Sequence, residues 1–148
     1  MNIHMPSVIK SGGIAAAVNL VLGLLAALPL VGCFFVPLVC LGWFVVPTAA
    51  GLGYGYLAPG KENLGESALG GALAGGFGGF VNGLAVGLLS LVTNAGFAAM
   101  SEDVEALPAA LAGGVVGLTV ALCVPTVGGL FFGAIGGAIW PAVQGERL

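Results

Sequence analysis

The chain has 148 residues, of which 59% are hydrophobic and only 6% are charged, and its formal net charge is −3. Because a soluble domain usually carries about 25% charged residues, and a chain this short could not bury so much apolar surface, the composition excludes an ordinary soluble protein. The sequence has no basic cluster that could bind phosphates, so we expect no nucleic-acid partner. We expect membrane lipids and other integral-membrane proteins as its surroundings.

The charged residues divide the chain into three uncharged tracts, at 11–60, 67–101 and 106–145. Each tract is longer than the roughly 20 residues that an α-helix needs to cross a bilayer. The tracts are continuously apolar and show no period-two alternation, which argues against a transmembrane β-barrel. The predicted fold is therefore an all-α integral membrane protein, a single transmembrane domain over residues 1–148 with four helices in two hairpins.

The first tract is long enough for two helices, which we expect at about 11–30 and 37–58. The segment from Pro29 to Pro37 contains the residues that usually form a turn between them. Tyr54 and Tyr56 are predicted to anchor the second helix at the membrane interface, and Pro59 with Gly60 is expected to end it.

The third helix is predicted at about 67–93, with Ser67 as its N-cap and Glu66 near the positive end of its dipole. An acidic external loop is expected at 94–108, and Pro108 suits the first turn of a fourth helix at 109–140. As one helix that segment would extend about 48 Å, well beyond the hydrocarbon thickness. Pro125 could kink it or split it, and the sequence does not choose between one helix and two.

The distribution of charges predicts the orientation. With four helices, Lys10, Lys61 and Arg147 lie on one side of the membrane and the acidic loop lies on the other. The positive-inside rule then places the N-terminus and the C-terminus in the cytoplasm. In composition the chain resembles the small, glycine-rich four-helix membrane proteins of bacteria, so we expect it in the bacterial cytoplasmic membrane.

Two rows of glycine recur at every fourth position, the spacing of a glycine zipper. In water each glycine would weaken a helix by roughly 0.5–1 kcal/mol relative to alanine, whereas in lipid such a row lets another backbone approach closely. The rows either join the third and fourth helices or face outward, toward a second copy or another protein. The predicted helix-packing residues are Gly71, Gly75, Gly79, Gly83 and Gly87 in the third helix, and Gly113, Gly117, Gly129, Gly133 and Gly137 in the fourth.

Asn19 and Asn82 are amides inside the first and third predicted helices, and each follows a pair of glycines at the same spacing. This echo suggests a duplicated hairpin, with chance similarity as the alternative. Such amides usually form interhelical hydrogen bonds worth about 0.6–2 kcal/mol. They are therefore predicted to join the helices, the alternative being the polar lining of a solute path.

No set of residues predicts catalysis. Cys33, Cys40 and Cys123 lack the spacing of metal ligands, and His4 is expected to be a solvated residue near the terminus. The acidic residues of the 94–108 loop lack the ligand spacing and the glycine turn of a calcium site. We therefore expect no enzyme activity, no metal and no cofactor.

Two functions fit these observations. The first is a non-catalytic accessory subunit that packs against a larger membrane protein complex through its glycine-rich helix faces, a respiratory or photosynthetic assembly being the commonest host. The second is a homo-oligomeric small channel or transporter assembled through the glycine rows, with Asn19 and Asn82 along its path. The sequence does not identify the partner complex, the oligomeric state or any bound lipid or pigment.

Overall fold

The computed structural model describes residues 3–26, 32–58, 63–100 and 106–145, and within these ranges the chain is helical throughout apart from a few residues at the helix ends. The predicted all-helical fold with four helices is confirmed: the helices are α1 (Met5–Ala26), α2 (Gly32–Leu57), α3 (Leu64–Met100) and α4 (Ala106–Gly145). Among the described residues, three helical segments are long and apolar enough to cross a membrane, namely Met5–Leu25, Leu64–Met100 and Pro108–Val143.

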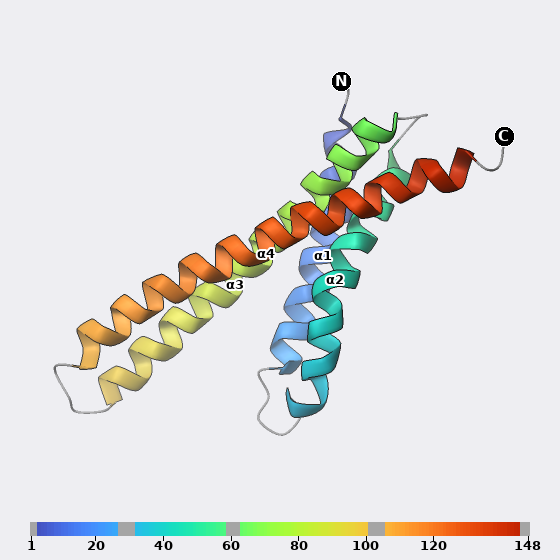
Figure 1. Ribbon diagram of the computed structural model, residues 1–148. Helices are drawn as coiled ribbons and strands as arrows, with labels where there is room; N and C mark the ends of the chain where they lie inside the picture. Colours follow the sequence, from blue (N-terminus) through green and yellow to red (C-terminus); the bar gives the residue numbers. More distant parts are fainter. Residues whose placement is uncertain (1–2, 27–31, 59–62, 101–105, 146–148) are drawn as a thin grey trace.

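The four helices form two antiparallel hairpins, α1–α2 and α3–α4, that lie together at one end and diverge toward the other (Figure 1). The helices α3 and α4 share the most extensive contact, and α3 also touches α1 and α2. Within the described residues α1 and α4 do not touch. The end at which α1 and α3 begin and α2 and α4 finish is called the closed end below.

The buried core lies at the closed end and consists mainly of small side chains. Ser7, Ser11 and Ser67 are buried among them, and within the described part of the chain Tyr54 is the one large side chain that is fully buried. Small residues allow the helix axes to approach closely, which is the usual way that helices associate in lipid. The buried hydrophobic residues are Val8, Ala15, Ala16, Ala50, Tyr54 and Ala74.

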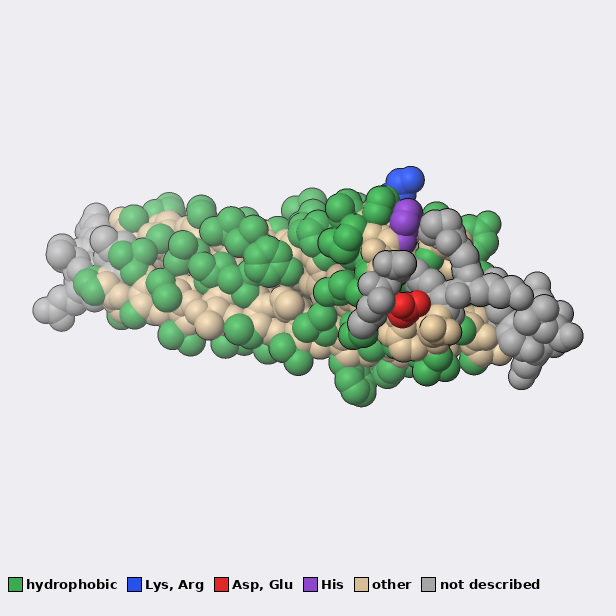
Figure 2. Space-filling model, turned by 90° about the horizontal axis from the view of Figure 1, so that it is seen from above, with side chains coloured by type: hydrophobic (Ala, Val, Ile, Leu, Met, Phe, Trp, Pro, Cys, Tyr) green, Lys and Arg blue, Asp and Glu red, His purple; other side chains and the backbone are tan. Residues whose placement is uncertain are grey.

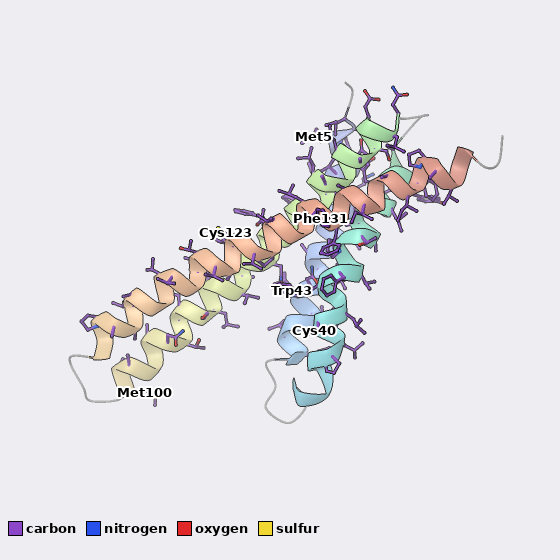
Figure 3. All side chains as sticks on the ribbon, viewed as in Figure 1. Met5, Cys40, Trp43, Met100, Cys123 and Phe131 are labelled. Carbon is purple, nitrogen blue, oxygen red and sulfur yellow. The ribbon has the colours of Figure 1, made fainter. Side chains whose placement is uncertain are left out.

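Hydrophobic side chains cover much of the face shown in Figure 2, and exposed large hydrophobic residues lie on all four helices. In the most hydrophobic stretch of each apolar segment, the share of residues that is buried is only 28% in α1, 12% in α3 and 6% in α4. An exposed apolar surface of this extent suits a lipid environment and not water. Figure 3 shows the side chains of the α3–α4 hairpin directed away from it on most sides, with Met100 and Cys123 among the exposed ones.

All four helices begin earlier than the sequence predicts, α4 at Ala106 instead of residue 109. Helix α1 begins at Met5 instead of residue 11, because the His4 carbonyl accepts the first backbone hydrogen bonds and Pro6 suits a first turn. Helix α2 begins at Gly32 instead of residue 37 and includes Pro37. Pro37 is the sixth residue of α2 and Pro47 lies farther inside it; each removes one backbone hydrogen bond, and neither ends the helix.

The third helix also differs from its prediction at both ends. It begins at Leu64, and the Asn63 carbonyl accepts the Ser67 backbone N–H, so Ser67 lies inside the helix and is not its N-cap. Glu66 lies in the first turn, as predicted. The helix continues to Met100, through the first seven residues of the segment 94–108 that is predicted as a loop. Asn94 does not end it, because its Nδ2 donates 2.7 Å to the Ser90 carbonyl of the preceding turn.

The fourth helix is one continuous element from Ala106 to Gly145, with Pro108 in its first turn and Pro125 and Pro141 inside it. The question left open by the sequence is therefore answered in favour of one helix. At about 1.5 Å per residue, α4 is about 60 Å long, roughly twice the hydrocarbon thickness. The acidic residues Glu102, Asp103 and Glu105 and the cations Lys61 and Arg147 lie outside the described residues.

Candidate site between the two hairpins

The glycine rows of α3 and α4 lie against each other. A Cβ atom built on Gly71 would lie 2.8 Å from the Gly137 Cα, and one built on Gly75 would lie 2.9 Å from the Gly133 Cα. Such distances are shorter than real Cβ atoms tolerate, so only glycine fits at these positions. Eight of the ten predicted packing glycines would bring a Cβ atom within 3.0 Å of the opposite helix, Gly87 at the Leu118 side chain and the other seven at backbone atoms: Gly71, Gly75, Gly79, Gly83, Gly87, Gly129, Gly133 and Gly137.

The other two predicted glycines do not take part in this contact. A Cβ atom on Gly113 would have no atom within 4 Å, and one on Gly117 would meet only the Ser90 Oγ at 3.8 Å. Both belong to the part of α4 that extends away from α1 and α2 in Figure 1. In this part of α4, Gly114 faces α3 and packs on Leu91, whereas Gly113 does not face α3.

Helix α2 packs on the part of α4 that contains Gly133, Gly136 and Gly137. A Cβ atom on Gly51 would lie 2.7 Å from the Gly137 backbone nitrogen, and one on Gly136 would lie 2.9 Å from the Thr48 carbonyl carbon. Nearer the closed end, the Trp140 side chain covers Gly55 and its ring meets Tyr56 edge to face at 5.6 Å between centroids. Glycine thus serves two interfaces of α4, one with α3 and one with α2.

The prolines of α4 are matched by groups of α3. A proline lacks the N–H that would bond the carbonyl four residues earlier, so Pro141 leaves the Gly137 carbonyl without its helical partner and Pro125 does the same to Ala121. The Ser67 hydroxyl donates to the Gly137 carbonyl at 2.7 Å. The Ala121 carbonyl points at Gly83, whose Cα–H can form a weak hydrogen bond to it, a contact that Gly75 and Gly79 also make to carbonyls that keep their helical partners.

This matching lowers the cost of the two prolines inside α4. A carbonyl left unpaired in hydrocarbon is costly, and neighbouring helices and hydroxyl side chains are the usual compensation in membrane proteins. Both compensating groups come from α3, at positions 67 and 83, and their spacing equals that of the two prolines. The sequence signal was therefore present, but only the pairing of α3 with α4 gives it meaning.

A second polar cluster, which sequence reasoning missed, joins α1 to α2 at the closed end. The His4 Nδ1 lies 2.7 Å from the Ser7 Oγ, which donates to the Leu57 carbonyl at 3.0 Å. The His4 backbone N–H donates to the Tyr54 hydroxyl at 3.2 Å. His4 is therefore held in a hydrogen-bonded cluster while its side chain stays partly exposed, as expected of a residue near the terminus.

Tyr54 is also placed differently from its prediction. It is fully buried and does not anchor the helix at an interface, because its ring lies over Gly70, where any side chain would clash. Tyr56, by contrast, is 72% exposed.

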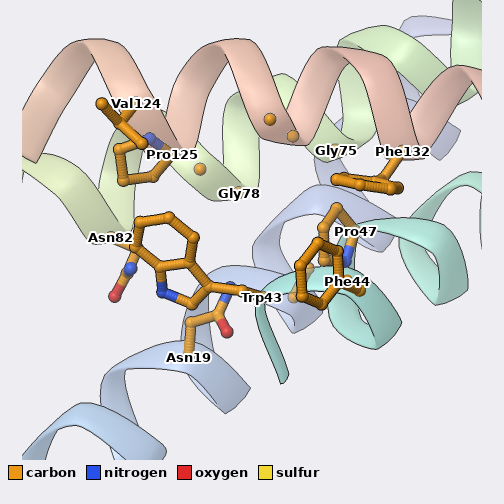
Figure 4. Close-up of a pocket in the computed structure, with 14 residues that line it drawn as sticks. Asn19, Trp43, Phe44, Pro47, Gly75, Gly78, Asn82, Val124, Pro125 and Phe132 are labelled. Atoms are coloured by element: carbon orange, nitrogen blue, oxygen red, sulfur yellow. The ribbon is translucent and has the colours of Figure 1, made fainter. Parts of the chain in front are cut away.

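The divergence of the hairpins leaves a cleft with a pocket at its apex. The pocket has a volume of about 300 Å³ and is lined by all four helices, and the cleft continues from it with a volume of about 1020 Å³. Both spaces share Asn19 from α1, Trp43 from α2, Asn82 from α3 and Pro125 from α4 (Figure 4). The structure thus brings together the two predicted interhelical amides and adds an indole.

Among the described residues, no hydrogen bond joins the Asn19 and Asn82 side chains. The Asn82 Oδ1 is buried and has no hydrogen-bond partner. The lining of the pocket and the cleft contains no charged residue. The apex is therefore an uncharged polar spot within an apolar space.

The remaining candidate residues stay apart. Cys40 and Cys123 are free and exposed, and the side chain of Cys33 lies outside the described part of the structure. Within the described ranges, no group of His, Cys, Asp or Glu side chains is close enough to hold a metal ion.

Comparison with known proteins adds no relative: no family model, no curated protein and no solved structure matches this chain.

Proposed function

We propose that the chain is a non-catalytic accessory subunit of the bacterial cytoplasmic membrane that packs against a larger integral-membrane protein. The observation that carries this proposal is the distal arm, residues 88–100 of α3 and 106–117 of α4. In Figure 1 the arm extends beyond α1 and α2 as two helices alone. A partner helix beside it would give its open glycines the close contact that they lack within the chain.

The surface of the distal arm supports this use. Val92 is 67% exposed and Val116 is 64% exposed, and Gly113 has open space where a Cβ atom would lie. A helix glycine with no neighbour costs stability without any gain in packing. We infer that Gly113 receives the backbone of a partner helix, in the same way that Gly133 receives α3.

The experiment compares two substitutions that no contact within the chain opposes. Gly113 lies on the distal arm and Gly65 lies at the closed end, and neither has an atom within 4 Å of its Cβ position. We expect Gly113→Leu to abolish co-migration with a large partner in blue-native gels of gently solubilised membranes, whereas Gly65→Leu leaves it intact. Migration of the parent chain as a discrete homo-oligomer would refute the proposal.

The homo-oligomeric channel requires the glycine rows to face another copy. In the structure eight of the ten glycines named for that role already face α3 or α4 within one chain. We therefore propose that the glycine-zipper contact is chiefly intramolecular. The open distal arm favours the accessory subunit over the channel.

The proposed orientation has both termini in the cytoplasm, which requires all four helices, α2 included, to cross the membrane. Lys10 is exposed near the start of α1, at the closed end, which would then face the cytoplasm. The proposed internal repeat relates α1–α2 to α3–α4, and it is supported by the meeting of Asn19 and Asn82 at one pocket. Reporter fusions at residues 30 and 103 would both be periplasmic if this topology is correct.

A further inference from the structure

The apex pocket and the cleft form one continuous space that is open to the bilayer between the hairpins. Their shared lining residues show the continuity, and the hairpins diverge from this point (Figures 1 and 4). Volumes of about 300 and 1020 Å³ fall in the range of small-molecule sites, which are usually apolar with a few convergent polar groups. The lining of the space includes Leu89 and Gly117 at the base of the distal arm, whereas Gly113, on which the proposed function rests, is not a lining residue.

The polar groups at the apex define what the occupant must offer. The Asn82 side chain lines the space, and its Oδ1 is a buried acceptor without a partner. A rotation of the amide that turns the Oδ1 toward the space lets an occupant supply the missing donor. The amide nitrogens of Asn19 and Asn82 and the indole of Trp43 are donors, so the occupant must also accept. Because no charged residue lines the space, a charged group would lack compensation.

We propose that the cleft binds an uncharged lipid with a free hydroxyl, a diacylglycerol or a similar lipid alcohol. A hydroxyl is the smallest group that both donates and accepts a hydrogen bond. It lies in the apex pocket between Asn19 and Asn82, and the hydrocarbon chains follow the apolar walls of the cleft. Lipid esters only accept hydrogen bonds, and phospholipid head groups are charged, so neither completes the Asn82 amide in this way.

Trp43 provides a direct measurement, because it lines the site and is one of two tryptophans in the chain. In the Trp140→Phe background, Trp43 is the sole indole. The protein is placed in phosphatidylcholine nanodiscs and titrated with dioleoylglycerol brominated on its acyl chains, which quenches a nearby indole. The matched probe is the same lipid with its hydroxyl acetylated, which can accept but not donate.

We expect saturable quenching by the alcohol and about tenfold weaker apparent affinity for the acetate, since one hydrogen bond in a buried site accounts for a difference of that order. Asn82→Leu should reduce the preference to less than about twofold. Asn94→Leu is the control, because Asn94 is an exposed amide of the same helix that bonds Ser90. It should leave the preference unchanged.

Three results would overturn the proposal. The first is equal quenching by the alcohol and the acetate in the parent protein. The second is equal quenching by brominated phosphatidylcholine at the same mole fraction, which would mean that bulk lipid fills the cleft. The third is an unchanged preference in Asn82→Leu, or in Asn19→Leu if the first variant does not fold. The parent comparison decides the question without any variant of the site.

Discussion

The hydrogen bond between Ser67 and the carbonyl freed by Pro141 predicts a specific energetic coupling between α3 and α4. Ser67 is 1% exposed, and its Oγ donates to the Gly137 carbonyl at 2.7 Å. Ser67→Ala removes the donor and leaves that carbonyl buried without a partner. We expect a loss of about 1–2 kcal/mol in the free energy of unfolding, in the upper part of the range for interhelical hydrogen bonds in membranes.

The same reasoning predicts that Pro141→Ala suppresses this loss. Alanine at position 141 supplies the N–H that closes the helical hydrogen bond to Gly137, so the carbonyl no longer depends on Ser67. In the Pro141→Ala background we expect Ser67→Ala to cost less than about 0.5 kcal/mol. The difference between the two backgrounds is the coupling energy, and it excludes the separate effect of the proline on helix stability.

The assay is reversible unfolding in mixed micelles, followed by Trp140 fluorescence in a Trp43→Phe background. Trp140 is a suitable reporter because it packs on Gly55 of α2. Ser11→Ala is the matched control, since Ser11 is 4% exposed and its hydroxyl donates to the Ser7 carbonyl of its own helix at 2.8 Å. That carbonyl keeps its helical partner, so the control should cost little. An equal loss from Ser67→Ala in both proline backgrounds would refute the reasoning.

Three further predictions concern glycines and the residues that they face. Gly75→Ala should lower the free energy of unfolding by about 1–3 kcal/mol in the same assay, because the added methyl group meets backbone atoms of Gly129 and Gly133. Gly13→Ala is the control and should stay within about 0.5 kcal/mol of the parent, since a Cβ atom there has open space. Equal effects of the two substitutions would contradict the close contact. Gly70→Ala should be similarly destabilising because it strikes the buried Tyr54 ring, and the loss should shrink in a Tyr54→Leu background. Gly83→Ala should destabilise through the Ala121 carbonyl, while Gly128→Ala, on the same hairpin with open space, serves as its control; a tolerated Gly83→Ala would show that the carbonyl can move away.

The sequence by itself determined the class of protein and most of the helical segments. Uncharged tracts longer than 20 residues require internally bonded backbone in a bilayer, so helical spans follow from composition, and the turn residues from Pro29 to Pro37 divide the first tract into two helices. The helix boundaries were predicted less accurately, because a helix end depends on single groups such as the Asn63 carbonyl, which bonds Ser67. It also depends on whether the chain continues as a helix through a proline such as Pro37. The four-residue period also marked the faces that pack, because spacing fixes the side of a helix on which a residue lies.

Only the tertiary structure decided what those faces meet. A glycine row looks the same whether it receives a helix of its own chain or of another, and the choice depends on which carbonyl lies opposite each Cα. Pro125 and Pro141 could not be interpreted locally, because their freed carbonyls are matched by Gly83 and Ser67 on a different helix. Asn19 and Asn82 echo each other in the sequence, yet the divergence of the hairpins sets them around a pocket, with the Asn82 Oδ1 unpaired. Spacing along one helix fixes a face, whereas contact between faces depends on how the helices cross.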